Sequence, residues 1–270
     1  MVSAVRQVDW LLMGAAAFIL ALGLVTLFSF HGGDGGNVFF SRQIIWGVGS
    51  IATAGLLSVG DFRFLRRPGV LVGFFAVICG LLAFLILFGR AVRGVHGWID
   101  LGSFRVQPAD PAKLVLILLL AKYFSRRHIE IANVRHILIS GLYAFVLFVL
   151  VLLQPDFGSA IIIATVWLGM VAISGISKRH LATVLLVGLA GVGALWFFVF
   201  EDYQRARLVS FLNPTADLLG TGYNAYQSVV AVGSGEMLGK GIGFGSQSRL
   251  LFLPEYGTDF IFAAFAEEWG

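Results

Sequence analysis

The sequence predicts an all-α, polytopic membrane protein with seven transmembrane helices and the start of an eighth. The 270 residues are 58% hydrophobic and 13% charged, whereas soluble domains are about half apolar and about a quarter charged. The mean hydropathy is +0.89. Seven apolar runs approach the ~20 residues that a membrane-crossing helix needs.

The apolar runs follow one another with short connections until residue 200. The first run follows Arg6 and is too long for a signal-peptide core, so we expect it to be retained as a span. An eighth run begins near residue 260. We therefore expect one membrane domain over residues 1–270, with a large outer loop at about 201–258. The seven runs cover residues 10–30, 43–60, 70–89, 111–124, 136–153, 157–176 and 181–200.

The net charge of +4 is distributed by loop. Loops on one side carry ten Lys and Arg residues against three acids, and loops on the other side carry nine against ten. Cytoplasmic loops are enriched in Lys and Arg, so the N-terminus is predicted to be cytoplasmic and residues 201–258 to lie outside. A basic chain of this kind predicts membrane topology and not a nucleic-acid partner.

Basic residues on the outer side run against this trend. They indicate an anionic ligand such as phosphate, which Arg binds through its planar fork. The alternative is that they pair with nearby acids or with lipid headgroups. The outer basic residues of the two long loops are Arg90, Arg93, Arg105, Lys113, Arg205, Arg207, Lys240 and Arg249.

Two Gln-Pro segments precede predicted spans. In "QPADPAKL", Asp110 before Pro111 is typical of a helix N-cap, and its spacing from Lys113 allows the two side chains to pair. Lys113 is also a site candidate, because a Lys near the start of a span usually faces a cavity. In "QPDFGS", Asp156 is expected to cap the next helix.

The stretch "GSGEMLGKGIGFG" does not fit a nucleotide-binding loop. Ser234 stands where such a loop needs Gly, and Gly241 stands where it needs Ser or Thr. The five histidines lack the spacing of zinc ligands. We therefore expect neither a nucleotide nor a histidine-bound metal.

Asp259 stands where the outer loop meets the eighth apolar run. A carboxylate there can accept a proton from an alcohol held within hydrogen-bond reach. The alternative is that Asp259 caps the next helix together with Thr258. Glu267 and Glu268 lie two turns further in, where ionisable groups usually face the interior of a helix bundle.

Several segments together resemble the RodA/FtsW family, also called the SEDS proteins, with the RodA branch favoured. They are "GWIDLG", "QPADPAKL", "QPDFGS", "DYQRAR", "LNPTADLLGTGYNAYQS", "VGSGEMLGKGIGFGSQ" and "LPEYGTDFIFAAFAEEWG". The resemblance implies a multi-pass protein of the bacterial cytoplasmic membrane. It also implies a peptidoglycan glycosyltransferase that polymerises lipid II on the outer face, serving cell elongation and shape or division.

The resemblance implies roles for particular residues. Asp259 lies in the family's Thr-Asp-Phe-Ile-Phe segment and becomes the expected catalytic residue. It also implies a divalent cation, Mg²⁺ or Mn²⁺, and a class B penicillin-binding protein as the transpeptidase partner. The expected substrate-binding residues are Lys113, Asp110, Arg205, Arg207, Lys240, Arg249 and Gln247.

The chain departs from the family pattern at four positions and in length. Asp110 replaces the usual Glu, Pro111 a bulky apolar residue, Gly257 a common His and Glu236 a usual Gly. Family members have about ten spans, so we expect this chain to be a fragment that is itself inactive. Two other functions stay open: a flippase or transporter for lipid II, and a non-enzymatic scaffold for a transpeptidase.

Overall fold

The computed structural model forms two compact units, one of residues 1–60 with 194–270 and the other of residues 61–193. This division does not test the expectation of a single membrane domain, which stays a prediction. The described residues are 9–30, 36–92, 95–100, 105–125, 134–198, 200, 202–213, 217, 218, 220 and 222–270.

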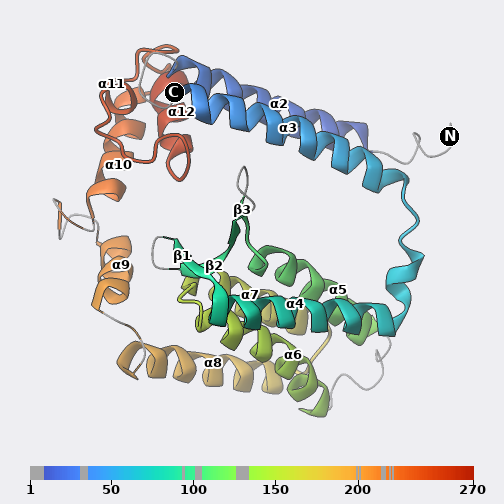
Figure 1. The fold of residues 1–270 in the computed structure, drawn as a ribbon. Coiled ribbons are helices and arrows are strands. Elements are labelled where there is room, and N and C mark those ends of the chain that lie inside the picture. The colour runs from blue at the N-terminus through green and yellow to red at the C-terminus, as the bar shows by residue number, and fades with distance from the viewer. Residues whose placement is uncertain are drawn as a thin grey trace. The chain divides into compact units, whose positions relative to one another are not determined.

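All seven predicted spans are helices (Figure 1). The largest difference is at the second, which begins at Gly36 and not at residue 43, because its first turns contain polar residues that an apolar run does not include. The seven helices are α2 (Trp10–Ser29), α3 (Gly36–Val59), α4 (Pro68–Phe88), α5 (Ala109–Ser125), α6 (Val134–Leu152), α7 (Phe157–Ile173) and α8 (Lys178–Phe198).

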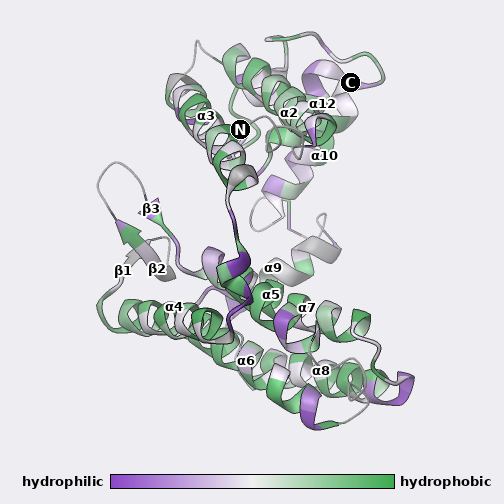
Figure 2. Cartoon of the chain, turned by 90° about the vertical axis from the view of Figure 1, so that its right-hand side faces the viewer, coloured by the Kyte–Doolittle hydropathy of each residue, from purple (hydrophilic) through white to green (hydrophobic). Residues whose placement is uncertain are grey.

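The composition of these helices fits a membrane. Among the described residues, α2, α4, α6 and α8 are each long and apolar enough to cross a bilayer. Helices α5 and α7 have 17 residues each and are shorter than a full span. Apolar residues dominate the helices, and hydrophilic residues gather toward their ends and connections (Figure 2). The predicted all-α polytopic fold is confirmed.

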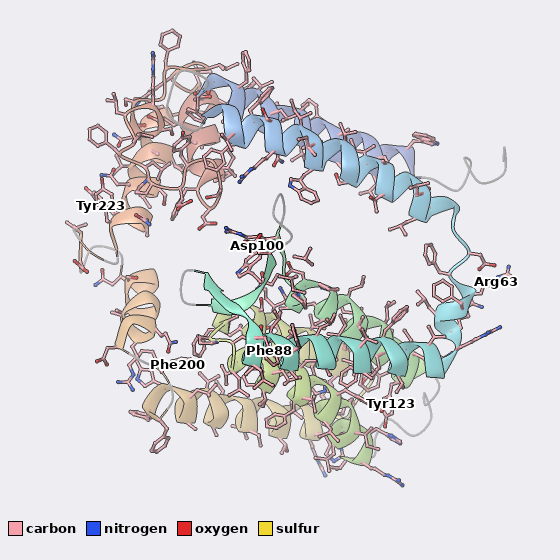
Figure 3. All side chains as sticks on the ribbon, in the orientation of Figure 1. Arg63, Phe88, Asp100, Tyr123, Phe200 and Tyr223 are labelled. Carbon is pink, nitrogen blue, oxygen red and sulfur yellow. The ribbon has the colours of Figure 1, made fainter. Side chains whose placement is uncertain are left out.

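The unit of residues 61–193 is built around α4, α5, α6 and α7. Helix α4 packs against α5 and α6, and α7 packs against both α5 and α6. Two charged residues flank the apolar helix α4: Arg63 lies near its start, and Asp100 lies beyond Phe88 at its end (Figure 3). The side chains fully buried at its centre are Leu82, Leu116, Leu120, Leu147 and Ile163.

The two Gln-Pro segments meet in this unit. The Gln107 amide donates to Asp156 Oδ2 at 2.6 Å, and Asp156 Oδ1 accepts from the Ser159 backbone N–H at 3.0 Å. Gln154, which is fully buried, donates from Nε2 to the Leu82 carbonyl at 2.9 Å. The predicted N-cap at Asp156 is confirmed, and these contacts join the starts of α5 and α7 to α4.

The segment before α5 contains a small antiparallel sheet that the sequence analysis did not predict. Its strands are β1 (Arg90–Val92), β2 (Val95–Asp100) and β3 (Arg105–Val106), in the order β1-β2-β3. Ile99 pairs with Val106 and Asp100 with Arg105, and the Asp100 and Arg105 side chains also form an ion pair at 3.8 Å. Strands this short carry too few residues for an alternating apolar pattern to stand out.

In the other unit, α2 and α3 pack against each other, and the described part of residues 201–258 contains more helix than the predicted loop. It contains α9 (Asp202–Leu212), α10 (Tyr223–Gly235) and α11 (Ser246–Arg249). The eighth predicted helix is α12 (Ile261–Trp269), which packs against α2 and α10. The buried core comprises Phe30, Ala231, Leu253, Tyr256, Ala263 and Ala264.

Packing around α5 predicts a contrast between two leucines of the same helix. Leu116 is fully buried, whereas Leu114 is 58% exposed. We expect Leu116→Ala to destabilise the full-length protein by about 2–5 kcal/mol, because a cavity is left among α4, α6 and α7. Leu114→Ala is the control and should cost under about 1 kcal/mol. Thermal unfolding in detergent measures both, and equal losses would contradict the packing described here.

Candidate functional site

Asp259 lies in a turn that leads directly into α12. The N-cap residue of this helix is Phe260, and no side chain caps it. The Thr258 hydroxyl instead donates to Glu255 Oε2 at 2.9 Å. The Asp259 side chain is exposed and makes no hydrogen bond or ion pair with any residue that the structure describes. The capping interpretation of Asp259 and Thr258 is therefore wrong, and the Asp259 carboxylate is open to a ligand.

The turn of residues 254–260 is held by its own backbone hydrogen bonds and by a ring contact with α2. The backbone N–H groups of Thr258 and Phe260 both donate to the Glu255 carbonyl, at 3.1 and 3.2 Å. The buried Tyr256 ring packs edge-on against Phe30 at the end of α2, with ring centroids 4.8 Å apart. A turn fixed in this way keeps the Asp259 backbone in one place.

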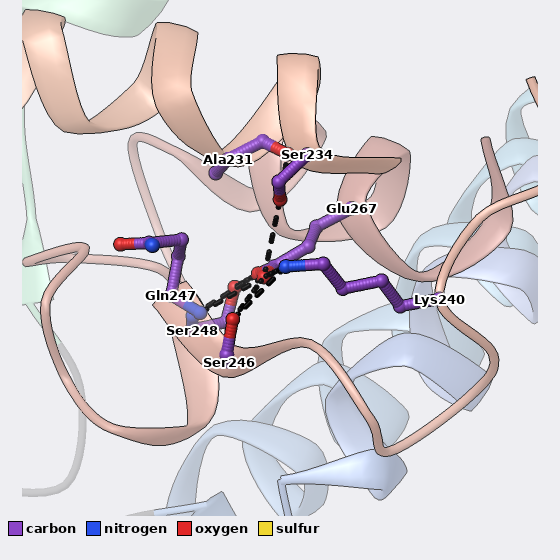
Figure 4. Close-up of polar contacts among 7 residues, drawn as sticks. All are labelled: Ala231, Ser234, Lys240, Ser246, Gln247, Ser248 and Glu267. Carbon is purple, nitrogen blue, oxygen red and sulfur yellow. Dashed lines mark hydrogen bonds and ion pairs between the residues drawn. The ribbon is translucent and has the colours of Figure 1, made fainter. Parts of the chain in front are cut away.

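A buried carboxylate, Glu267, organises the segment that precedes the turn (Figure 4). Its side chain lies on α12 and is fully buried. Oε1 accepts from Lys240 Nζ at 3.2 Å and from the Gln247 backbone N–H at 2.9 Å. Oε2 accepts from the Ser248 N–H at 3.1 Å and the Ser248 hydroxyl at 2.9 Å. The contacts of Oε1 with the Ser246 and Ser234 hydroxyls are longer, at 3.4 and 3.5 Å.

Residues Gly239–Arg249, here called the glycine-rich loop, wrap the end of α12. Gly239, Gly241 and Gly243 all have positive φ, between 72° and 94°, which other residues rarely adopt. The Gly241 N–H donates to the Glu268 carbonyl at 3.0 Å, and the Gly243 N–H donates to Glu268 Oε1 at 2.9 Å. These amides are therefore directed at carboxylate and carbonyl oxygens of α12.

Glu268 joins α12 to α2 and also binds the glycine-rich loop. Its Oε1 accepts from the Ser29 hydroxyl at 2.7 Å as well as from Gly243. The next residue, Trp269, donates from its indole N–H to the Thr26 hydroxyl at 3.2 Å. Glu268 Oε2 is buried and accepts no hydrogen bond from the part of the chain that the structure describes. Two adjacent acids thus fix two different segments to one helix.

Close backbone approach makes this arrangement possible. A Cβ at Gly235 would collide with the Ala266 carbonyl oxygen, and one at Gly245 would lie 2.9 Å from Glu267 Oε2. Glu236, at a position where the resemblance leads one to expect Gly, has a φ of 51°. A residue with a side chain in this left-handed region is strained by about 1–2 kcal/mol.

The predicted substrate-binding residues of this unit lie in different surroundings. Lys240 is engaged by Glu267 and by the Ser246 hydroxyl, 2.9 Å away. Gln247 binds Glu267 through its backbone, and its side chain points away from that carboxylate (Figure 4). Arg249 is exposed and donates to the Gly243 carbonyl at 3.4 Å. Their roles in substrate binding stay predictions.

Two further predicted residues lie on α9. Arg205 donates from Nε to the Trp196 carbonyl at 3.1 Å and pairs with Asp202 at 3.5 Å. The Arg207 side chain lies outside the described residues.

Asp110 and Lys113 belong to the other unit. Lys113 Nζ lies 2.9 Å from Asp110 Oδ1, which confirms the predicted pairing. The predicted N-cap at Asp110 is wrong, because α5 begins at Ala109 and the Asp110 carboxylate binds Lys113. The Pro108 carbonyl accepts from Ala112, so the helix starts earlier than the Asp-Pro pair indicated.

Sequence reasoning identified Glu267 and Glu268 as interior acids but did not assign them a role. Two adjacent ionisable residues within an apolar run were the available signal. Their partners could not be found in this way, because Ser29, Gly243 and Ser248 are distant in sequence and are not distinguished by type or spacing.

Comparison with known proteins assigns the chain to a family. Residues 4–270 match the family model of the FtsW, RodA and SpoVE cell cycle proteins. The chain belongs to the FtsW/RodA/SpoVE family. The predicted resemblance is confirmed, and with it a multi-pass membrane protein.

Members of the FtsW/RodA/SpoVE family are similar to this chain over much of its length. Peptidoglycan glycosyltransferase MrdB of Escherichia coli K12 is 40% identical over 195 residues, which are 72% of this chain and 52% of MrdB. A probable peptidoglycan glycosyltransferase FtsW of Tolumonas auensis is 35% identical over 260 residues, 93% of this chain and 65% of that protein. The chain thus spans about half the length of MrdB.

Solved structures of this family share the fold. A chain of a peptidoglycan synthase complex, studied for its coordination of polymerization and crosslinking, superposes with a TM-score of 0.73 at 31% identity, over 97% of this chain and 71% of that one. The rod shape determining protein RodA of Thermus thermophilus gives a TM-score of 0.58 at 27% identity, over 95% and 81% of the two chains.

The contact between α10 and α12 predicts opposite effects at two glycines of α10. Gly235→Ala should destabilise the protein by about 1–3 kcal/mol, because the new Cβ forces the α12 backbone away. Gly233→Ala, two residues earlier, meets nothing within 4 Å and should be neutral or stabilising by up to about 1 kcal/mol. Thermal unfolding of the full-length variants tests this, and a neutral Gly235→Ala would refute the close approach.

Proposed function

We propose that this chain is part of a peptidoglycan glycosyltransferase that polymerises lipid II into glycan strands for cell elongation and shape. The observation that carries the proposal is that the Asp259 carboxylate is exposed and available to a ligand. Asp259 neither caps α12 nor forms an ion pair among the described residues, and it stands on a turn that is held in place. The names of the relatives, MrdB and FtsW, support the same reaction.

Asp259 acts as the general base in this reaction. Its carboxylate accepts the proton from the sugar 4-hydroxyl of one lipid-linked disaccharide. The oxygen then bonds to the anomeric carbon of a second, and the bond from that carbon to the diphosphate oxygen breaks. Undecaprenyl diphosphate leaves with the bonding electron pair. A base within hydrogen-bond reach of the hydroxyl typically contributes 10²- to 10⁴-fold, by order of magnitude.

A diphosphate leaving group requires positive charge nearby. Arg249, exposed on the glycine-rich loop, and Lys113, paired with Asp110, are proposed to contact it. Arg205, Arg207 and Lys240 are further candidates, although Lys240 is already engaged by Glu267. Gln247 and Asp110 complete the proposed set through polar contacts with sugar or peptide.

A divalent cation, Mg²⁺ or Mn²⁺, suits the same chemistry. Mg²⁺ is usually held by one or two carboxylates together with substrate phosphates. Asp259 fits that requirement, because its carboxylate is open to a ligand; no cluster of three metal-binding side chains lies among the described residues. Such an ion, held by Asp259 and the diphosphate, would neutralise negative charge on the leaving group.

The proposed setting is the bacterial cytoplasmic membrane, with the N-terminus in the cytoplasm and Asp259 at the outer face. The excess of Lys and Arg in one set of loops supports this orientation. The proposed partner is a class B penicillin-binding protein that crosslinks the new strands. Its support is the similar chain solved within a complex that couples polymerization to crosslinking.

The outer basic residues also fit a lipid II transporter, and a scaffold for a transpeptidase remains the third hypothesis. The three differ in what they require of Asp259. A general base cannot be replaced by an amide, whereas a transporter with its path elsewhere, or a scaffold, tolerates Asn at that position.

Asp259→Asn is the direct test of the proposed base. The full-length protein, purified in detergent with fluorescent lipid II and Mg²⁺ or Mn²⁺, should form glycan ladders, and the variant should lower kcat about 10²- to 10⁴-fold. Glu255→Gln is the matched control, an acid of the same turn whose amide can still accept from Thr258; it should keep kcat within about threefold. Normal polymer from folded Asp259→Asn would refute the base, and no polymer from wild type would favour the transporter or scaffold.

Lys113→Ala tests binding of the diphosphate separately from the chemical step. Loss of one charge-assisted contact should raise KM for lipid II about tenfold with a smaller effect on kcat, since such a contact is made before the transition state. Lys178→Ala, which removes a Lys at the predicted cytoplasmic side, is the control and should leave KM unchanged. An unchanged KM in Lys113→Ala would show that Lys113 pairs with Asp110 but does not bind the diphosphate.

A further inference from the structure

We infer that Glu267 is a positioning residue, whose buried carboxylate fixes the glycine-rich loop to α12 and thereby holds the turn that carries Asp259. The inference rests on the proposed function, in which Asp259 is the base. It assigns Glu267 a role in catalysis without contact with substrate.

Each carboxylate oxygen of Glu267 accepts at least two hydrogen bonds. Oε1 accepts from Lys240 Nζ and the Gln247 N–H, and Oε2 accepts from the Ser248 N–H and hydroxyl. A carboxylate offers acceptors only, so each of these donors is satisfied at once. The side chain is 0% exposed, so water cannot replace a contact that is lost.

The contacts of Glu267 lead to Asp259 in a few steps. Gln247, held by its N–H, accepts from the Leu253 N–H through its carbonyl at 3.0 Å. Leu253 is 0% exposed and packs with Tyr256 and with Ala263 and Ala264 of α12. The next residues form the turn of 254–260. A loop released from Glu267 would therefore free the start of the turn.

Glu268 provides an internal comparison, because it is equally buried but differently bonded. Only its Oε1 accepts hydrogen bonds, from Ser29 and Gly243, and Oε2 accepts none from the described residues. A Gln at 268 can turn its carbonyl oxygen to both donors. A Gln at 267 must point its NH₂ group either at Lys240 and the Gln247 N–H or at the Ser248 N–H and hydroxyl. Only the Ser248 hydroxyl can accept a hydrogen bond, so in either orientation at least one backbone N–H faces an NH₂ group.

The experiment compares Glu267→Gln with Glu268→Gln in the full-length protein, by lipid II polymerisation and by hydrogen exchange of the backbone amides. We expect Glu267→Gln to lower kcat about 100-fold, the cost of misplacing a catalytic group by about 1 Å. It should also raise KM for lipid II, because the released loop carries the proposed substrate-binding residues Lys240, Gln247 and Arg249. Amides of residues 247–260 should exchange at least about tenfold faster. Glu268→Gln should stay within about threefold of wild type in kcat, and its exchange in this segment should be unchanged.

A milder variant covers the case in which Glu267→Gln does not fold. Ser248→Ala removes one hydroxyl donor and leaves the carboxylate in place, so it should lower kcat about tenfold and raise exchange only near residue 248. Exchange in this variant indistinguishable from wild type would overturn the inference.

The outcomes separate this inference from the proposed function. Wild-type exchange and kcat in folded Glu267→Gln, or equal effects of both Glu→Gln changes, would overturn the role of Glu267 while Asp259→Asn still decides the base. If wild type makes no polymer, the proposed function fails. Faster exchange confined to Glu267→Gln would then still support the anchoring of the loop, and unchanged exchange would overturn it.

Discussion

A carboxylate buried in an apolar helix must find hydrogen-bond donors, and meeting this requirement shapes the unit that contains Asp259. Glu267 gathers Lys240, Gln247 and Ser248, and Glu268 gathers Ser29 and Gly243. Both acids bind the glycine-rich loop, and Glu268 also binds Ser29 at the end of α2. One helix of nine residues therefore holds both the glycine-rich loop and the end of α2. An uncompensated charge here would cost several kcal/mol, by order of magnitude, which makes the arrangement specific as well as stable.

Gly235 and Gly245 are needed because the backbone around them lies very close to α12. For its carboxylate to reach the backbone amides of Gln247 and Ser248, Glu267 must approach the loop without a side chain in between, and Gly245 leaves that space. Gly235 likewise lets α10 approach the backbone of α12. The glycine-rich loop resembles a phosphate-binding loop in composition, but its amides donate to oxygens of α12. Asp259 is exposed and makes no hydrogen bond or ion pair with the described residues, while the N–H groups of Thr258 and Phe260 on either side both donate to the Glu255 carbonyl.

The other unit is also held together by polar side chains, here at the ends of its helices. Gln107, Gln154 and Asp156 join α4, α5 and α7 through amide and carboxylate contacts next to the Lys113–Asp110 pair. Polar groups concentrated at helix ends leave the middle of the bundle to leucines, which suits helices that cross a membrane. Both predicted functional lysines are thus paired with an acid, but Lys240 meets a fully buried one and Lys113 an exposed one.

The sequence by itself determined the helices, the membrane character, the family and the prominence of Asp259, because each depends on local composition or on a contiguous segment. It also determined the cap at Asp156 and the pairing of Lys113 with Asp110, which lie within one turn of their partners. It failed at Asp110, where helix capping was plausible locally, and it left capping open as an alternative at Asp259. It also missed the short strands before α5. Only the tertiary structure decided that Asp259 is unengaged by described residues while Glu267 is saturated with donors, because those donors lie some twenty residues or more away along the chain and reach α12 only after the loop folds back on it.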